Sequence, residues 1–203
     1  MKGLMKKELL MLKRATRAFA FICVIFVAMS ALSQDNAFFM LMPIMISGLL
    51  PSTLLSYDER CKWQEFSGAL PVSRAQLVSA KYLLGLGCMT VILALTLGLH
   101  LIVRRYPMDM LLSLLGGICG LSLFISAVSL PMMFKFGVEK GRIWYYATLI
   151  LVGGASGASA GVAKDFFSVG IPPAYVWLIL AIGAVCFALS WLLSVRFYQQ
   201  REF

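Results

Sequence analysis

The sequence is poor in charged residues, and this scarcity excludes an ordinary soluble domain. Only 13% of its 203 residues are charged, and 61% are hydrophobic, whereas a soluble domain carries about 25% charged residues. So small a charged fraction cannot give most of the chain a water-compatible surface. The composition therefore predicts an all-α, polytopic membrane protein that forms a single transmembrane domain over residues 1–203.

The chain also lacks the motifs that membrane enzymes and ion-driven transporters use. The phosphate-binding pattern G-x-x-x-x-G-K-[ST] does not occur, so ATP-driven work would need a separate subunit. The apolar runs contain almost no ionisable residues away from their ends, and the single histidine, His100, has no carboxylate partner for a proton relay. We therefore expect no enzymatic activity and no catalytic residue. No C-x-x-C spacing occurs, which gives no support to a metal or redox site or to a cofactor; the cysteines are Cys23, Cys61, Cys88, Cys119 and Cys186.

The net charge of +9 is explained by the positions of the basic residues rather than by nucleic-acid binding. They lie in short segments between apolar runs, which are close to the length of a spanning helix and cover residues 18–33, 37–55, 76–103, 110–130, 143–163 and 174–195. With a cytoplasmic N-terminus, the outside segments contain only three of the eighteen lysines and arginines: Arg104, Arg105 and Lys164. The positive-inside rule thus predicts six spans in the cell membrane, with both termini cytoplasmic and no nucleic-acid partner.

Residues 1–17 have the pattern of an amphipathic helix. One face carries Met5, Leu9, Leu12 and Thr16, and another carries Lys6, Lys13 and Arg17. Such a helix can lie in the membrane interface with its lysines near anionic head groups. The alternative is a plain basic flank before the first span, which would still orient the protein.

The longest polar interval, residues 56–84, contains two capping boxes. Ser56-x-x-Glu59 predicts the start of a short cytoplasmic helix over 57–69, and Ser73-x-x-Gln76 predicts the start of the next helix. Pro71 should end the first helix, because it lacks an N–H and disfavours the helical conformation at Leu70.

The short helix mixes aromatic residues with charges of both signs, including an expected i,i+4 pair between Asp58 and Lys62. Such a mixture is typical of a docking surface, in which aromatic residues anchor a partner and charges set the register. A solvated loop with a few interfacial aromatics is the alternative that composition leaves open.

Glycines recur at four-residue spacing in the fourth and fifth apolar runs. Removing side chains from one helix face in this way lets a second backbone approach closely. The glycines expected to serve helix packing are Gly116 and Gly120, then Gly153, Gly157 and Gly161. They fit packing inside the monomer, and they also fit a dimer seam or a sliding surface.

The layout of the chain, and above all the polar interval, resembles the ABC-2 type permease family. The resemblance rests on residues 56–63, on residues 70–74 and 81–83, and on the Lys-rich opening after Met1. It is closest to small six-span permeases that pair with a separate ATPase subunit, and some of these are linked to export of antimicrobial peptides or immunity to them. Cys61 departs from the small polar residue expected at its position.

The resemblance implies that residues 1–17 form an interfacial elbow helix and that 56–74 is the cytoplasmic coupling segment. The residues implied to contact the ATPase are Tyr57, Asp58, Glu59, Arg60, Lys62, Trp63, Glu65 and Phe66. The resulting expectation is a permease subunit that exports an amphipathic peptide or lipid-like substrate, or gives immunity to one, as a homodimer or as a heterodimer with a related permease. The alternative is a membrane scaffold or regulator that recruits a cytoplasmic partner without moving a solute.

Overall fold

The computed structural model describes residues 2–15, 17–32, 37–63, 66, 73–103, 107–158 and 173–200. The described residues are almost entirely helical. The helices are α1 (Lys2–Ala15), α2 (Arg17–Leu32), α3 (Ala37–Arg60), α5 (Arg74–Val103), α6 (Met108–Phe136), α7 (Val138–Ala158) and α9 (Pro173–Gln200).

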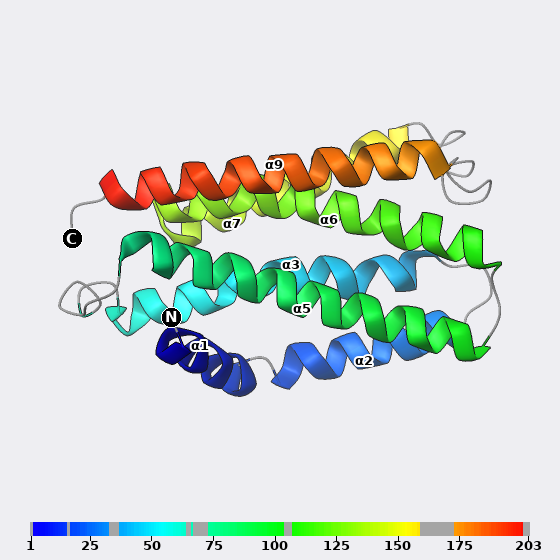
Figure 1. Ribbon diagram of the computed structural model, residues 1–203, viewed down its shortest axis with the longest axis horizontal. Coiled ribbons are helices and arrows are strands. Elements are labelled where there is room, and N and C mark those ends of the chain that lie inside the picture. The colour runs from blue at the N-terminus through cyan, green and yellow to red at the C-terminus, as the bar shows by residue number, and fades with distance from the viewer. Residues whose placement is uncertain are drawn as a thin grey trace.

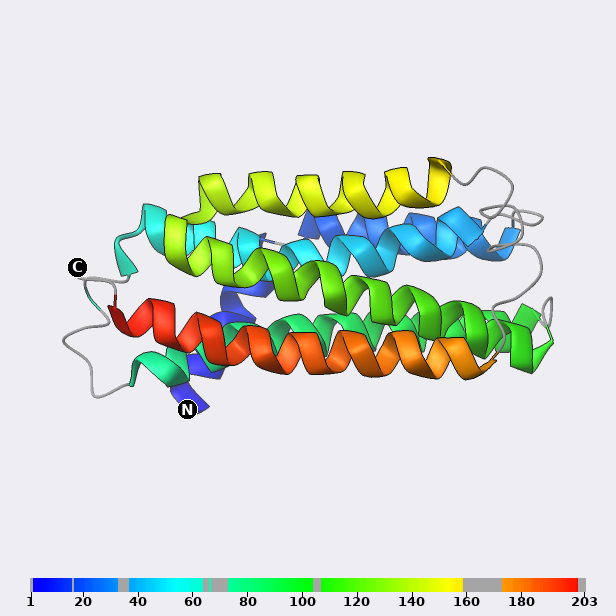
Figure 2. The ribbon, with the colours of Figure 1, turned by 90° about the horizontal axis from the view of Figure 1, so that it is seen from above.

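Six helices, α2 to α9, lie side by side along one direction, and α1 crosses that direction near one end (Figures 1 and 2). The same end holds the last turn of α3, the first turn of α5, the α6–α7 turn and the last turn of α9. We call it the basic end, because the segments predicted to be cytoplasmic gather there.

Length and composition support four of the six expected spans. Helices α3, α5, α6 and α9 are long and apolar enough to cross a membrane. Helix α2 is apolar but shorter. Spanning by α2 and α7 therefore stays a prediction, as does the orientation of the termini.

The two predicted capping boxes have different outcomes. Ser73 N–H donates to Gln76 Oε1 at 3.2 Å, and Gln76 N–H donates to Ser73 Oγ at 3.3 Å, so the box that starts α5 is confirmed. Ser56, in contrast, lies inside α3, which continues to Arg60. A separate helix beginning at Ser56 is therefore wrong, because a residue inside a continuous helix has no orphaned N–H groups to cap.

The end of α3 follows from the backbone after Arg60. Lys62 N–H bonds Glu59 C=O at 3.1 Å, which tightens the last turn, and Lys62 adopts a positive φ of 50°. A left-handed residue cannot continue a right-handed helix. The expected break at residues 69–71 lies outside the described residues.

Helix α6 is the centre of the bundle and packs most extensively against α9. The contact is close because small residues face one another: a Cβ at Gly120 would lie 3.0 Å from the backbone oxygen of Ile179, and one at Gly183 would lie 2.6 Å from the backbone oxygen of Gly120. A Cβ at Gly116 would likewise meet Val176 at 2.7 Å. Gly153 and Gly157 lie on the α7 backbone, and Gly161 is outside the described residues.

The outward faces of α2, α5 and α9 are strongly apolar. Large exposed side chains include Phe21 on α2, Val91 on α5, and Trp177 and Val185 on α9. A water-soluble protein rarely exposes contiguous apolar area of this kind. The outer surface of the bundle therefore suits contact with lipid tails.

Candidate functional site

Four predicted coupling residues lie on the last turn of α3, and their side chains point in different directions. Tyr57 is 41% exposed, Asp58 is buried, Glu59 is partly buried and Arg60 is exposed. Successive residues on a helix are rotated by about 100°, so one turn distributes its side chains over all faces. The segment is therefore divided between residues that hold the fold and residues that face outward.

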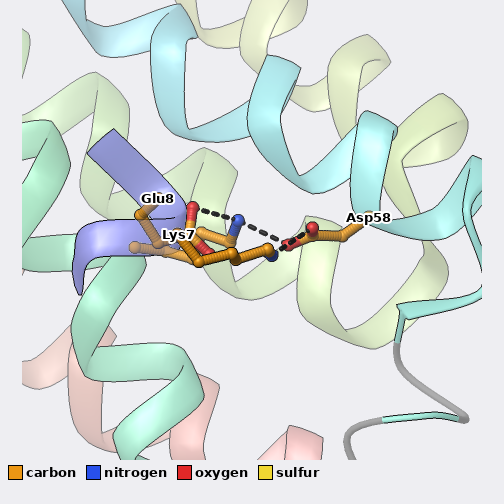
Figure 3. A network of polar contacts seen from close by, with 4 residues as sticks. Lys7, Glu8 and Asp58 are labelled. Carbon is orange, nitrogen blue, oxygen red and sulfur yellow. Dashed lines mark hydrogen bonds and ion pairs between the residues drawn. The ribbon is translucent and has the colours of Figure 1, made fainter. Parts of the chain in front are cut away.

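Asp58 belongs to a buried cluster of two acids and two bases from three helices. Its carboxylate lies 2.5 Å from the Nζ of Lys7 on α1 and 2.5 Å from the Nζ of Lys81 on α5. Glu8 of α1 completes the ring, at 2.7 Å from Lys81 Nζ and 3.2 Å from Lys7 Nζ (Figure 3). We call these four residues the ion cluster.

The ion cluster is electrically neutral, and each acid contacts both bases. Glu8, Asp58 and Lys81 have side chains exposed by only 2–5%, whereas Lys7 is 22% exposed. Charges this deep are tolerated only when they are paired and hydrogen-bonded, because removal from water is costly. The cluster thus fixes the relative positions of α1, α3 and α5.

The predicted pairing of Asp58 with Lys62 is wrong. Within the described chain, Asp58 pairs with Lys7 and Lys81, while Lys62 is exposed beyond the end of α3. An i,i+4 pair requires helical geometry at both residues, and the positive φ of Lys62 removes it.

Glu59 links the same turn of α3 to a different part of the bundle. Its Oε2 accepts a hydrogen bond from the backbone N–H of Val138 at 3.3 Å. Val138 is the first residue of α7 and follows Gly137, whose φ of 87° favours glycine. The carboxylate therefore lies at a helix N-terminus, where the partial positive charge stabilises it.

Trp63 contacts α1 as well. Lys7 Nζ lies 4.3 Å from the centre of the Trp63 ring, a cation–π distance. The Trp63 and Phe66 rings are 5.6 Å apart. Lys7 thus touches both Asp58 inside the bundle and the aromatic pair that follows α3.

The outward-facing residues of the segment are basic or aromatic. Tyr57, Arg60, Lys62 and Phe66 are exposed, and we call them the exposed coupling face. Cys61 lies beside them and is also exposed. Glu65 lies outside the described residues. Two cations and two aromatic rings suit a partner surface that offers acidic residues and an apolar pocket.

Sequence reasoning missed the α1 and α5 members of the ion cluster. Glu8 is the only acid in the first 17 residues, and it stands four positions from both Leu4 and Leu12. Those spacings put an acid on an apolar helix face. An acid on a buried apolar face requires a nearby cation. The position of Glu8 was therefore the sequence signal that could have indicated the ion cluster.

Comparison with protein families identifies the chain. A family model described as "ABC-2 family transporter protein" matches residues 3–199, nearly the whole sequence. The chain belongs to the ABC-2 transporter family. The resemblance seen in the sequence is confirmed. Comparisons with curated proteins and with solved structures give no match.

Membership of the family indicates the kind of assembly to which the chain belongs. The chain is a multi-pass membrane permease subunit of an ABC transporter, and such subunits pair with an ABC ATPase subunit and are generally not enzymes themselves. Its own sequence has no phosphate-binding loop of the G-x-x-x-x-G-K-[ST] type.

The chain that follows the coupling segment is also held in place by contacts with the bundle. Arg74, the first residue of α5, donates to the carbonyl oxygens of Tyr198 at 3.3 Å and of Gln199 at 2.7 Å, at the end of α9. About two turns further along α5, the Tyr82 hydroxyl bonds the hydroxyls of Ser190 and Ser194 of α9, each at 2.7 Å. The chain on both sides of residues 64–72 is therefore tied to the bundle.

Proposed function

We propose that this ABC-2 permease exports an amphipathic peptide or lipid-like substrate, or gives immunity to one, with a separate ATPase supplying the energy. The apolar character of its helices supports a substrate that needs few polar contacts. The working unit in this proposal is a homodimer, or a heterodimer with a related permease, carrying two ATPase subunits. Gly153, Gly157 and Gly161 are candidates for the seam between the two permeases.

The observation that carries the coupling proposal is that some of residues 57–66 face outward while others bind neighbouring helices. The exposed coupling face presents Tyr57, Arg60, Lys62 and Phe66 to a partner. Asp58 and Glu59, which lie between Tyr57 and Arg60 in the sequence, bind other helices. Movement of the ATPase against the exposed residues would therefore be passed to α1 and α5 through Asp58, and to α7 through Glu59.

This proposal predicts that the exposed residues control ATPase coupling. We expect Arg60→Ala and Phe66→Ala each to weaken ATPase binding by roughly fivefold to thirtyfold, the range for a partner contact worth about 1–2 kcal/mol. Substrate-dependent ATP hydrolysis should fall with it. The measurement is ATPase titration against the purified permease, followed by ATP hydrolysis in reconstituted vesicles.

Lys140→Ala is the matched control, because Lys140 is an exposed cation in the first turn of α7, which lies at the basic end. It should leave binding within about twofold of the wild type. Equal loss in the control, or unchanged binding in both test variants, would contradict docking through residues 57–66. Binding that persists without stimulated hydrolysis would favour the scaffold alternative.

Cys61 gives a test of orientation. It is the exposed cysteine of the described chain and lies at the basic end, whereas Cys23 is buried and the other three lie partly covered in apolar helices. We expect a membrane-impermeant maleimide to label inverted vesicles and to spare right-side-out cells. Cys61→Ser should abolish this labelling. Labelling from outside intact cells would place the basic end on the wrong side for an ATPase.

A further inference from the structure

We propose that the outer face of α1 is a binding surface for anionic phospholipid head groups, and that lipid bound there sets the position of the coupling segment. The surface consists of Lys6, Leu9, Leu10 and Lys13, and we call it the lipid face. The part of the proposal that concerns coupling depends on the proposed function, whereas the binding of lipid does not.

The side chains of α1 separate by role. Leu4 and Glu8 are buried against the bundle, and Glu8 belongs to the ion cluster. On the opposite side, Lys6 and Lys13 are exposed, and Leu9 and Leu10 are 55% and 59% exposed. In a membrane interface, acyl chains lie beneath the anionic head groups. The exposed leucines can therefore contact acyl chains, while the lysines on either side of them contact head groups.

The direction of α1 fits this partner. Figure 2 shows α1 running across the direction that the other helices share. If those helices cross the bilayer, α1 lies along its surface. Helix α2, which follows α1 in the chain, also exposes apolar side chains such as Phe21 and Ile22, which suits contact with lipid.

The depth of α1 also fits. Its contact on α5 is Lys81, and α5 extends from there to Val103, a distance of about 33 Å at 1.5 Å per residue. That length is close to the ~30 Å hydrocarbon core of a bilayer. Helix α1 therefore lies at the level of one membrane surface. The first turns of α5, before Lys81, extend beyond that level by about 10 Å.

Adjacent lysines connect the lipid face to the coupling segment. Lys6 points outward, while Lys7 contacts Asp58 at 2.5 Å and the Trp63 ring at 4.3 Å. Anionic lipid that holds Lys6 and Lys13 in the interface would also hold Lys7 and Glu8 against α3 and α5. Loss of such lipid would loosen the position of Trp63 and Phe66.

The test is lipid binding by the full chain without any ATPase. The solubilised protein is titrated with phosphatidylglycerol, or with phosphatidylcholine as the neutral comparison, and bound lipid is counted by native mass spectrometry. Each surface lysine strengthens binding of anionic lipid by about fivefold. We expect Lys6→Gln with Lys13→Gln to weaken phosphatidylglycerol binding by roughly twenty-five-fold and to leave phosphatidylcholine binding unchanged.

Two further variants make the outcome decisive. Lys140→Gln with Arg196→Gln removes the same charge from exposed positions near the start of α7 and the end of α9 and should change binding by less than about twofold. Lys6→Arg with Lys13→Arg keeps the charge and should retain wild-type binding, which separates charge loss from misfolding. Equal loss in both Gln pairs, or no preference of the wild type for phosphatidylglycerol, would overturn the proposal.

The effect on coupling is measured last, in vesicles that also contain the ATPase. Substrate-dependent hydrolysis should be higher in phosphatidylglycerol vesicles than in phosphatidylcholine vesicles, and the Lys6→Gln, Lys13→Gln pair should lose that difference. If lipid binding depends on α1 but hydrolysis ignores lipid composition, the link to the coupling segment is wrong. If no ATPase couples at all, the proposed function fails, and the lipid result is unaffected.

Discussion

Lys81→Met is expected to lower the free energy of unfolding by about 3–5 kcal/mol, the cost of leaving a buried ion pair without one partner. Lys81 contacts Glu8 at 2.7 Å and Asp58 at 2.5 Å. Without it, two buried carboxylates share the single cation Lys7. The measurement is equilibrium unfolding in mixed micelles titrated with a denaturing detergent.

A second substitution distinguishes loss of charge balance from loss of packing. Asp58→Asn in the Lys81→Met background restores neutrality, because Lys7 and Glu8 remain as a pair. We expect the double variant to regain at least half of the lost stability. Lys140→Met, at an exposed position, should change stability by no more than about 0.5 kcal/mol. A double variant less stable than Lys81→Met alone would show that charge balance is not what the cluster supplies.

The second large effect is expected at the α6–α9 contact. Gly183→Ala should destabilise the chain by about 1–3 kcal/mol, the usual cost of overpacking. Its new Cβ would lie 2.6 Å from the backbone oxygen of Gly120, and a backbone atom cannot rotate away as a side chain can. The two helices would have to separate along their most extensive contact, which the same unfolding titration measures.

Gly87→Ala is the matched control for this prediction. Gly87 also lies inside a long apolar helix, but a Cβ there would meet nothing within 4 Å. It should be neutral or slightly stabilising, because alanine favours helix more than glycine does. Similar destabilisation by both substitutions would mean that the penalty comes from glycine loss in general rather than from the α6–α9 contact.

Local patterns predicted part of the local structure. The Ser73–Gln76 capping box started α5 as expected, because both of its hydrogen bonds join residues three positions apart. The box at Ser56 failed for an equally local reason, since the apolar helix before it does not stop. A capping pattern predicts a start only where the preceding residues leave the helix.

The pairing partners within the ion cluster could not be predicted from such patterns. Its Lys81–Glu8 contact joins residues 73 positions apart, and periodicity within one helix says nothing about which helix lies beside it. The resemblance therefore assigns all eight predicted coupling residues to contact with the ATPase. In the structure Asp58 and Glu59 bind other helices, so substitution of Glu59 or Trp63 would disturb the fold together with any docking.

The arrangement of charges in the ion cluster has a consequence for movement. The four residues divide into two pairs that are each neutral: Lys7 with Glu8, both on α1, and Asp58 with Lys81, between α3 and α5. Separating α1 from α3 and α5 would break the Lys7–Asp58 and Lys81–Glu8 contacts, but it would leave Asp58 paired with Lys81. Such a movement would leave no buried ion without a partner of opposite charge.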